Sequence, residues 1–329
     1  MYYVFSFIIF TSDFLLKSFV FRIIMKFAIR DDDLNFFYTP RMIENNIRDI
    51  WDICPISMSV IPFVKGNWIE NTKMLESLGP KNISGNIIKN IKQDNEIYDI
   101  AKNSELVLYI KNQIENKRVY LTVHAIHHRN EDENLPQLNN NFSIGAEFYT
   151  NLDLTTQLKK SVEHLEDTFG QKISVFTPPQ NMYSQKGFNA ISSNLLNICC
   201  YPLQLKKDFF KYIKMYGFAN VVKLINHRLN SKNFCHAPYP YVINTPTISI
   251  IDHKSLQPGT NINKLYESFD YVYSKNGNFV LSTHSYGFNH KMVGKDQTMG
   301  DALKKFLLYV KKKNMVEFVP VNQIFEESK

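Results

Sequence analysis

Short apolar segments alternate with longer amphipathic segments along most of this 329-residue chain, and no other feature of the sequence constrains its fold as strongly. The apolar segments have the length and composition of buried strands, whereas the amphipathic segments repeat apolar residues with the period of a helix. The predicted strands are 27–29, 56–63, 119–123, 173–176, 198–201, 247–251, 279–283 and 316–320. Because strands that alternate with helices form parallel sheets, the sequence predicts an α/β fold.

The predicted helices lie between these strands, and two of them carry clear end signals. Thr39 precedes Pro40, so a helix over 39–53 begins with a capping hydroxyl and a proline in its first turn. Gly170 follows an amphipathic segment at 154–169 and suits the left-handed residue that ends many helices. The other predicted helices are 97–114, 184–196, 206–228, 262–273 and 301–313. No linker or internal repeat interrupts the pattern, which indicates a single domain.

Residues 1–24 are apolar but do not read as a membrane span. Three charged residues interrupt them, namely Asp13, Lys17 and Arg22. The longest uninterrupted apolar run is too short to cross a bilayer, and the segment lacks the basic start and cleavage site of a signal peptide. It is an interfacial anchor, an extra helix, or an extension upstream of a functional start at Met25. We favour the last, because a strand follows Met25 at once, and therefore predict a catalytic domain over 25–329.

The composition is that of an ordinary soluble protein, with 44% hydrophobic and 21% charged residues. The formal net charge is +7, but the lysines are spread along the chain and no recognition motif accompanies them, so we expect no nucleic-acid partner. The four cysteines form no C-x-x-C pair and fit no disulfide framework. Free thiols indicate a reducing compartment, and we expect a cytoplasmic protein. Nothing in the sequence indicates an oligomeric state.

Polar and titratable side chains recur where the predicted strands end. They are Asp31, Asp32, Asp33, His124, Thr177, Asp252 and His284. In barrels and open α/β sheets the active site lies at the carboxyl ends of the strands. We therefore expect these side chains to form one site.

Three adjacent carboxylates, Asp31, Asp32 and Asp33, follow Arg30 at the end of the first strand. Carboxylates so close together repel one another, and this costs stability unless a cation lies among them. The alternative is a solvated acidic turn. Burial of the preceding strand favours a metal or catalytic role.

Three histidines lie within five residues, His124, His127 and His128, directly after the strand at 119–123. Histidine is the commonest metal ligand, and residues at i and i+4 converge on one ion if the chain turns helically there. We predict that His124 and His128 bind a metal, the alternative being a polar loop with incidental histidines. His284, at the end of another buried strand, is a candidate general acid.

The segment 176–181 reads Phe-Thr-Pro-Pro-Gln-Asn. Its prolines fix a loop, from which Pro179 and Asn181 would line a pocket. A rigid turn without a binding role is an equal alternative.

In this order, strand-Asp-Asp, His-x-x-x-His, Phe-x-Pro-Pro and Leu-x-x-His, the chain resembles the polysaccharide deacetylase superfamily, carbohydrate esterase family 4, which has the NodB-homology fold. The resemblance covers roughly 25–325. It implies a deformed (β/α) barrel of about seven parallel strands that holds a divalent metal, usually zinc. The segment 28–33 is similar to the start of a bacterial subgroup associated with surface-polysaccharide biosynthesis.

Carried over by position, the resemblance makes Asp32 the catalytic base and His284 the acid. The metal ligands would be Asp33, His124 and His128. The reaction would be metal-assisted removal of an N-acyl group, usually acetyl, from a sugar or polysaccharide. The residues expected to bind substrate or support the site are Arg30, Asp31, Pro179 and Asn181.

The chain departs from the family's pattern at its third motif. An arginine that orients the base is usual there, and Thr177 takes its place, leaving Arg30 as a substitute. The family's Asp-x-x-Asp-Trp segment is not recognisable near Asp252. The triple Asp also allows Asp31 and Asp32 to be the functional pair. Two alternatives therefore stay open: a hydrolase of another acyl or C–N bond, and a carbohydrate-binding relative without turnover.

Overall fold

The computed structural model describes residues 24–66, 93–132, 144–204, 209–234 and 236–326. The expectations for the N-terminal segment 1–24 concern residues that, apart from Ile24, lie outside this description. The strands are β1 (Met25–Leu34), β2 (Ile56–Val60), β3 (Phe63–Lys65), β4 (Ile97–Asp99), β5 (Val119–Val123), β6 (Val175–Phe176), β7 (Asn197–Cys199), β8 (Ile243–Asn244), β9 (Ser249–Ile251), β10 (Lys254–Ser255), β11 (Phe279–Thr283) and β12 (Val316–Phe318). The α-helices are α1 (Pro40–Trp51), α4 (Ser104–Glu115), α5 (Thr155–Phe169), α6 (Gln185–Ser193), α7 (Phe209–Tyr216), α8 (Phe218–Asn230), α9 (Ile262–Ser274), α10 (Met299–Lys311) and α11 (Val321–Ile324).

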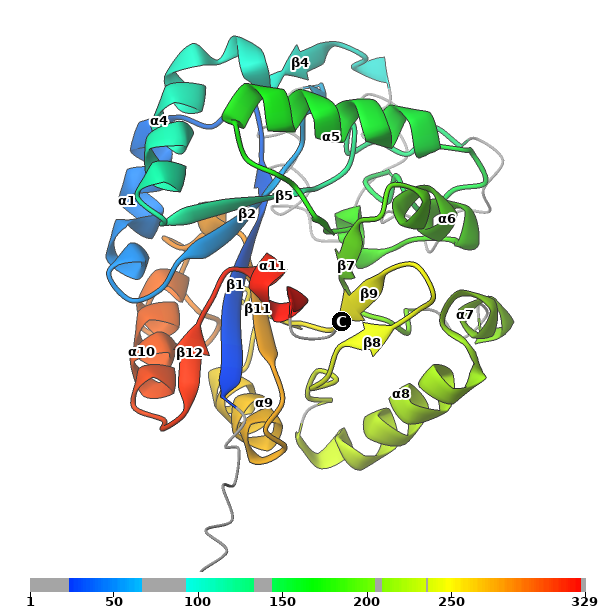
Figure 1. Cartoon of the computed structure of the whole chain (residues 1–329). Helices are drawn as coiled ribbons and strands as arrows, with labels where there is room; N and C mark the ends of the chain where they lie inside the picture. Colours follow the sequence, from blue (N-terminus) through cyan, green and yellow to red (C-terminus); the bar gives the residue numbers. More distant parts are fainter. Residues whose placement is uncertain (1–23, 67–92, 133–143, 205–208, 235, 327–329) are drawn as a thin grey trace, which may run out of the picture.

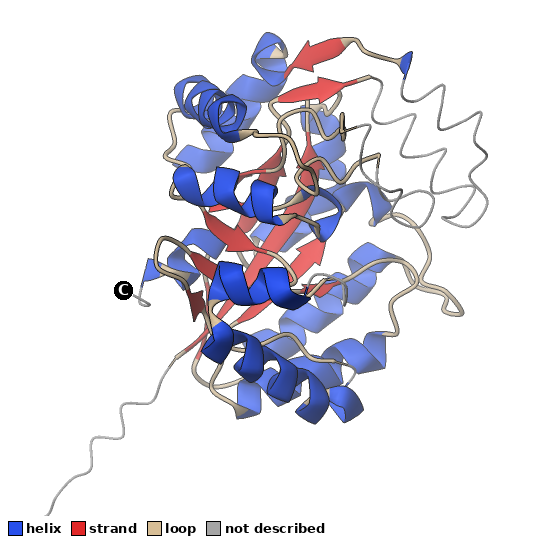
Figure 2. Cartoon of the chain, turned by 90° about the vertical axis from the view of Figure 1, so that its right-hand side faces the viewer, coloured by secondary structure: helices blue, strands red, loops and turns tan. Residues whose placement is uncertain are grey.

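The central sheet is mostly parallel and runs in the order β10-β11-β1-β2-β5-β6-β7-β9-β8, with β12 added beside the start of β1. Only the short β8 is antiparallel to its neighbour within this sheet. The peripheral helices surround the sheet (Figures 1 and 2). This arrangement confirms the predicted α/β fold. No helix in the described part of the chain is both long and apolar enough to cross a membrane.

The two ends of the sheet are joined by the chain itself. β9 pairs with β7, whereas β10 pairs with β11, and only Asp252 and His253 separate β9 from β10. With β9 and β10 taken as one interrupted strand, seven parallel strands follow one another in the order β1-β2-β5-β6-β7-β9/β10-β11, and among the described strands the hydrogen-bonded ring stays open between β9 and β10. The fold is therefore the deformed barrel that the resemblance implied.

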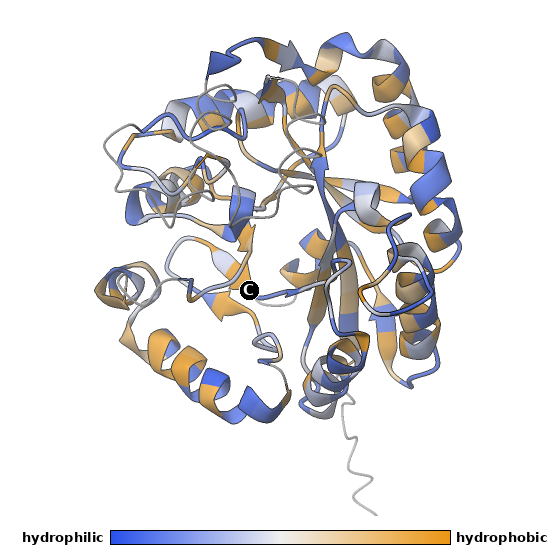
Figure 3. Ribbon diagram, turned by 180° about the vertical axis from the view of Figure 1, so that it is seen from behind, coloured by the Kyte–Doolittle hydropathy of each residue, from blue (hydrophilic) through white to orange (hydrophobic). Residues whose placement is uncertain are grey.

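The interior of this barrel is apolar at one end and polar at the other. Ala28 packs with other inward-facing residues and with α11, which lies in the middle of the ring (Figure 1). Side chains alternate between the two faces of a strand, so Arg30 and Asp32 point inward like Ala28, while Phe27 and Ile29 pack outward. The carboxyl half of β1 is consequently hydrophilic in the centre of the molecule (Figure 3). The polar end of the barrel is where the predicted site belongs.

Aromatic rings fill much of the core between the barrel and the helices α9 and α10. Phe27 stacks on Phe279 with ring centroids 5.7 Å apart, and Phe269 and Phe306 pack edge-to-face at 5.7 Å. Each of these four rings is fully buried. Burial of a large aromatic side chain contributes about 1.5–3 kcal/mol, so this cluster is a principal source of stability.

Two helix predictions were wrong in part. The segment 97–114 begins as β4, which pairs with β3, and α4 starts only after Asn103, whose side chain accepts a hydrogen bond from the Leu106 amide. The predicted helix at 206–228 is two helices, α7 and α8, because Gly217 between them adopts a left-handed φ of 83°. Asn and Gly at these positions are ordinary helix-end residues, whose effect the apolar periodicity had masked.

Gly187 provides a test of packing beside the site. It lies in α6, where an added Cβ would overlap the carbonyl oxygen of Phe148. We expect Gly187→Ala to lower the free energy of unfolding by about 1–3 kcal/mol, the usual cost of an overpacked site, measured by urea unfolding. Gly259→Ala is the control, because its Cβ would meet open space. Equal losses in both variants would contradict this steric explanation.

Candidate metal centre

Three buried side chains converge at the polar end of the barrel: Asp33 from β1, and His124 and His128 from the loop after β5. Their ligand atoms all lie within 4.8 Å of one another. Asp33 Oδ1 is 3.1 Å from His124 Nε2 and 3.4 Å from His128 Nε2. The structure thus brings together the three residues that the sequence predicted as metal ligands, and they could hold a metal ion.

A bulge at the end of β1 explains how two successive aspartates reach one site. In a regular strand Asp32 and Asp33 would face opposite sides of the sheet. The pairing of β1 with β2 shifts register between Asp31 and Leu34, and Asp33 takes a left-handed φ of 76°. Such backbone costs about 1–3 kcal/mol and tends to be kept where function requires it. The side-chain amide of Asn35 donates to the Asp33 carbonyl at 2.7 Å, which helps to hold the bulge.

The two histidines meet without the helical turn that the sequence suggested. Residues 124–128 form an irregular loop in which Ala125 and His128 have φ values of 84° and 54°. The ring centroids of His124 and His128 are nevertheless 5.1 Å apart. The spacing correctly predicted convergence, but the backbone that achieves it is a strained loop rather than a helix.

Glu147 holds this loop in place. Its buried carboxylate accepts hydrogen bonds from three successive backbone amides, those of Ile126 at 2.9 Å, His127 at 3.1 Å and His128 at 3.2 Å. No pattern in the sequence assigned a definite role to Glu147. Its only signal was an isolated acidic residue between apolar neighbours in Gly-Ala-Glu-Phe.

Glu147→Gln is therefore expected to weaken metal binding without unfolding the protein. The amide has one acceptor oxygen instead of two, so even where that oxygen takes the place of Oε2 the His127 amide loses its shorter contact, and the amide NH₂ group faces it instead. Loss of a group that orients metal ligands typically lowers affinity about 10–100-fold, and titration of the metal-free protein with zinc measures this. Glu163→Gln, a surface change on α5, is the control. Unchanged affinity in Glu147→Gln would show that the loop holds its shape without this carboxylate.

The hydrogen bond from His124 to Thr177 determines which of its ring nitrogens faces Asp33. The Thr177 carbonyl, 2.7 Å from His124 Nδ1, can only accept a hydrogen bond, so Nδ1 carries a proton. In the neutral ring, Nε2 then presents a lone pair to the Asp33 carboxylate. Burial opposes the charged ring, but Asp33 outweighs it and raises the pKa of His124. A proton on Nε2 would relieve this repulsion, and a divalent cation bound by His124, His128 and Asp33 fits the same donor set.

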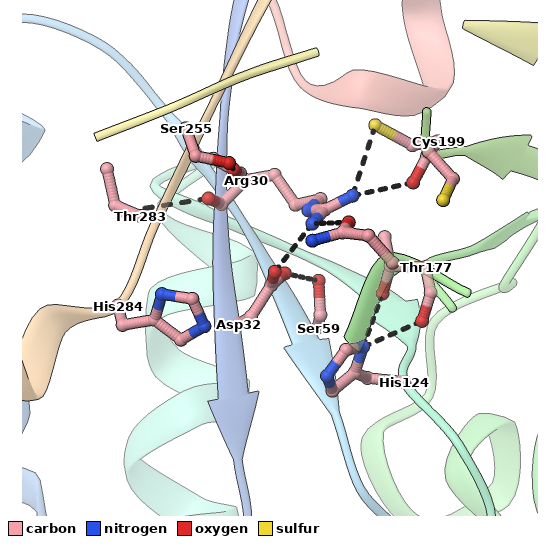
Figure 4. A network of polar contacts seen from close by, with 12 residues as sticks. Arg30, Asp32, Ser59, His124, Thr177, Cys199, Ser255, Thr283 and His284 are labelled. Carbon is pink, nitrogen blue, oxygen red and sulfur yellow. Dashed lines mark hydrogen bonds and ion pairs between the residues drawn. The ribbon is translucent and has the colours of Figure 1, made fainter. Parts of the chain in front are cut away.

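Asp32 lies beside the three candidate ligands and is held at both oxygens. Arg30 Nη2 donates to Oδ2 at 2.7 Å, and the Ser59 hydroxyl donates to Oδ1 at 2.8 Å. Arg30 is fully buried and also donates to Asn181 Oδ1 and to the Cys199 carbonyl. Figure 4 shows Asp32 between Arg30 and Ser59, with His124 and His284 on either side. Position 177, where the resemblance led us to expect an arginine, is a threonine in this chain. Arg30 from β1 contacts Asp32 instead.

Asp31 lies away from the candidate metal ligands. Its Oδ1 accepts a hydrogen bond from the Thr283 hydroxyl at 2.8 Å. Burial is the largest influence on this carboxyl and raises its pKa to about 6. The alternative pairing of Asp31 with Asp32 is therefore not the one that the backbone brings to the two histidines.

His284 stands at the rim of the site. Its Nε2 is 3.6 Å from Asp33 Oδ2, and its side chain is 26% exposed. A histidine in this position can reach both a bound molecule and solvent. Pro179 is buried and begins the short 3-10 turn Pro179–Asn181, which places the Asn181 side chain against Arg30.

Among the described residues, Asp252 bonds neither to the candidate ligands nor to His284. Its oxygens accept hydrogen bonds from the Tyr239 and His253 amides, and burial raises its pKa to about 7. Asp252 is therefore not one of the strand-end side chains that converge with Asp33, His124 and His128.

Comparisons with known proteins add a likeness of fold. No protein-family model and no curated protein matches the sequence. A Mycobacterium smegmatis protein assigned as a polysaccharide deacetylase aligns over 94% of this chain and 92% of its own, with 10% identity and a TM-score of 0.49. A family 4 acetyl xylan esterase from Clostridium thermocellum, solved with a cobalt ion, aligns over 91% and 90%, with 10% identity and a TM-score of 0.40. The α-amylase AmyC of Thermotoga maritima aligns over 92% and 74%, with 9% identity and a TM-score of 0.45. These likenesses are too weak to assign a family or a reaction.

Proposed function

We propose that this chain is a metal-dependent hydrolase that removes an N-acyl group, in the simplest case acetyl, from a sugar or polysaccharide. The observation that supports this most directly is the convergence of Asp33, His124 and His128 beside Asp32, whose two oxygens are both held. Two imidazoles and one carboxylate favour zinc and leave a coordination position open for water and substrate.

The divalent metal would activate a water molecule and polarise the acyl oxygen. Asp32 then takes the proton of the attacking water, as a general base at a fixed position. Arg30 and Ser59 restrict its carboxylate to one orientation, so little reorganisation is needed when the proton moves. Thr177 keeps His124 in the tautomer whose Nε2 faces the site.

His284 would donate a proton to the leaving amine. It comes from the end of β11, on the side of Asp32 opposite His124 (Figure 4), so acid and base reach the scissile bond from different strands. The His284 Nε2 atom lies 3.6 Å from Asp33 Oδ2, and the attraction between these two groups keeps the imidazole ring turned toward the site. Protonation of nitrogen is required for an amide to break, whereas an ester leaves without it, and a positioned acid therefore supports C–N hydrolysis.

The similarity of the segment 28–33 to a subgroup linked to surface polysaccharides supports a place in bacterial surface-glycan biosynthesis. The residues that carry the proposed reaction all fall within 25–329, which we take as the catalytic domain.

The decisive experiment measures acetate release from N-acetylated sugars and chitin oligomers, with O-acetyl xylan as the ester comparison. We expect release from the N-acetyl substrates, its loss after chelation and its recovery with added zinc. Release from the ester alone would replace amide hydrolysis by ester hydrolysis. If the zinc-loaded protein released acetate from none of these substrates, it would instead be a carbohydrate-binding protein without turnover.

A further inference from the structure

A large cavity opens next to the candidate metal centre. Its volume is about 940 Å³, which suits a ligand of several rings rather than a single small ion. Asn181 lines it and accepts a hydrogen bond from Arg30, whose same nitrogen binds Asp32. Ser255 lines it as well, and its hydroxyl bonds to that of Ser282, two residues before His284. Asn181 and Arg30 therefore connect a molecule in the cavity to the proposed base.

The charged residues that line the cavity are strongly unbalanced. Among the described lining residues, the cations are Arg228, Lys232, Lys254 and Lys264, and the only carboxylate is Asp252. Both oxygens of Asp252 accept hydrogen bonds from backbone amides, so this carboxylate is already engaged. Within the described residues no ion pair joins Arg228, Lys232 or Lys264 to an acid, whereas Lys304 and Lys291 elsewhere on the surface pair with aspartates. Cations gathered around one hollow repel one another and attract an anion from solution.

The N-terminus of α9 adds to this positive field. Thr260, Asn261 and Lys264 line the cavity at the start of this 13-residue helix. The Asn261 side chain caps this turn by accepting hydrogen bonds from the Asn263 and Lys264 amides, so the helix contributes the positive end of its dipole, which favours anions such as phosphate. The helix and the surrounding cations therefore favour the same kind of ligand.

His253 indicates that the cavity is built to bind something polar. It lines the cavity and is only 1% exposed, yet neither ring nitrogen makes a hydrogen bond to a described residue. Its ring stacks on Tyr201, another lining residue, with centroids 4.1 Å apart. A buried polar group without a partner costs about 1–3 kcal/mol, which a ligand or a bound water would offset. Burial, together with the nearby charges of Arg30 and His284, keeps the pKa of His253 low, so the neutral ring can donate one hydrogen bond and accept another.

We propose that this cavity binds the phosphate of a phosphorylated sugar, so that the N-acyl sugar reaches the metal centre attached to a phosphate or diphosphate group. The sugar part of this proposal rests on the proposed function, whereas the phosphate part rests on the cavity alone. A carboxylate carries one charge, but a phosphate monoester carries about 1.5–2, which matches a cluster of several cations better.

The test compares binding of N-acetylglucosamine 1-phosphate, inorganic phosphate, N-acetylglucosamine and glucuronate to the zinc-loaded protein by calorimetry. We expect the sugar phosphate to bind at least about tenfold more tightly than the uncharged sugar and than glucuronate. This advantage should shrink as salt is added, because exposed lysines contribute to it. Equal affinity for the sugar with and without phosphate would overturn the proposal, and glucuronate binding as tightly as the sugar phosphate would overturn the preference for phosphate.

A charge-matched pair of double variants separates the cavity from the metal as the source of binding. Lys232→Gln with Lys264→Gln removes two lining cations, while Lys160→Gln with Lys223→Gln removes two exposed lysines that do not line the cavity. We expect the first pair to lose at least about tenfold in affinity for the sugar phosphate and the second to lose almost none. Equal affinities would show that phosphate binds at the metal instead, and would overturn the proposal. Because binding is read without turnover, the result stands even if the proposed deacetylation fails.

Discussion

Asp33→Asn is expected to lose the bound metal and, with it, measurable hydrolysis. Both histidine Nε2 atoms face Asp33 Oδ1, so the carboxylate supplies the only negative charge among the three candidate ligands. A neutral amide is a poor zinc ligand, and two histidines alone make an incomplete site. A metal ion contributes several kcal/mol of charge stabilisation, and each 1.4 kcal/mol is a factor of ten, so we expect activity to fall at least about a thousandfold. Metal content after dialysis and acetate release measure both losses.

Asparagine is the better substitution here because the backbone of Asp33 has a positive φ. Asparagine tolerates that conformation, whereas alanine would add strain and confuse loss of metal with loss of structure. Asp31→Asn is the matched control, since its carboxylate contacts Thr283 and lies outside the three convergent groups. It should keep its metal. Loss of metal in Asp31→Asn but not in Asp33→Asn would reverse the assignment and support Asp31 and Asp32 as the functional pair.

The sequence predicted the framework well because the period of the apolar residues decides it. The strand ending at Val123 and the helix from Thr39 to Trp51 lie where the pattern placed them. The interrupted strand β9/β10 was recognised only in its first half. Lys254 and Ser255 form just two residues of strand, which is too short for any period to show.

The residues of the candidate site could be predicted from the sequence, but the backbone geometry that brings them together could not. Alternation along a strand predicts opposite directions for Asp32 and Asp33, and a run of three aspartates carries no sign of the bulge that reverses this. Only the register between β1 and β2 reveals it. Glu147 was out of reach for a related reason: its partners are backbone amides about 20 residues earlier in the chain, and no local pattern encodes them.

Arg30 contacts Asp32 from a different position in the chain than the arginine that the resemblance led us to expect. The resemblance placed an orienting arginine where Thr177 stands, and the sequence could suggest Arg30 only as a substitute. Arg30 and Asp32 are two apart on one strand, so their side chains share a face and point into the barrel together. The 2.7 Å contact between them follows from that spacing. Thr177 instead contacts His124 Nδ1 through both its carbonyl oxygen, at 2.7 Å, and its hydroxyl, at 3.1 Å.

Asp32→Asn is expected to lower kcat by about 10²–10⁴-fold while the metal stays bound. Asparagine has nearly the same shape, and its oxygen can still accept a hydrogen bond from Ser59 or Arg30. What it cannot do is take a proton from water. The Km should change little, since the three candidate metal ligands are untouched. Steady-state acetate release and the metal content of the purified variant measure these two effects.

Ser59→Ala tests the contribution of the hydrogen bond from Ser59 to Asp32 separately from that of the Asp32 carboxylate itself. It removes one of the two hydrogen bonds to Asp32 but leaves the carboxylate, so we expect a loss of kcat well below that of Asp32→Asn. Activity of Asp32→Asn within tenfold of the wild type would remove Asp32 from the mechanism. The base would then have to be another group at the site, such as His284, whose Nε2 lies 3.6 Å from Asp33 Oδ2.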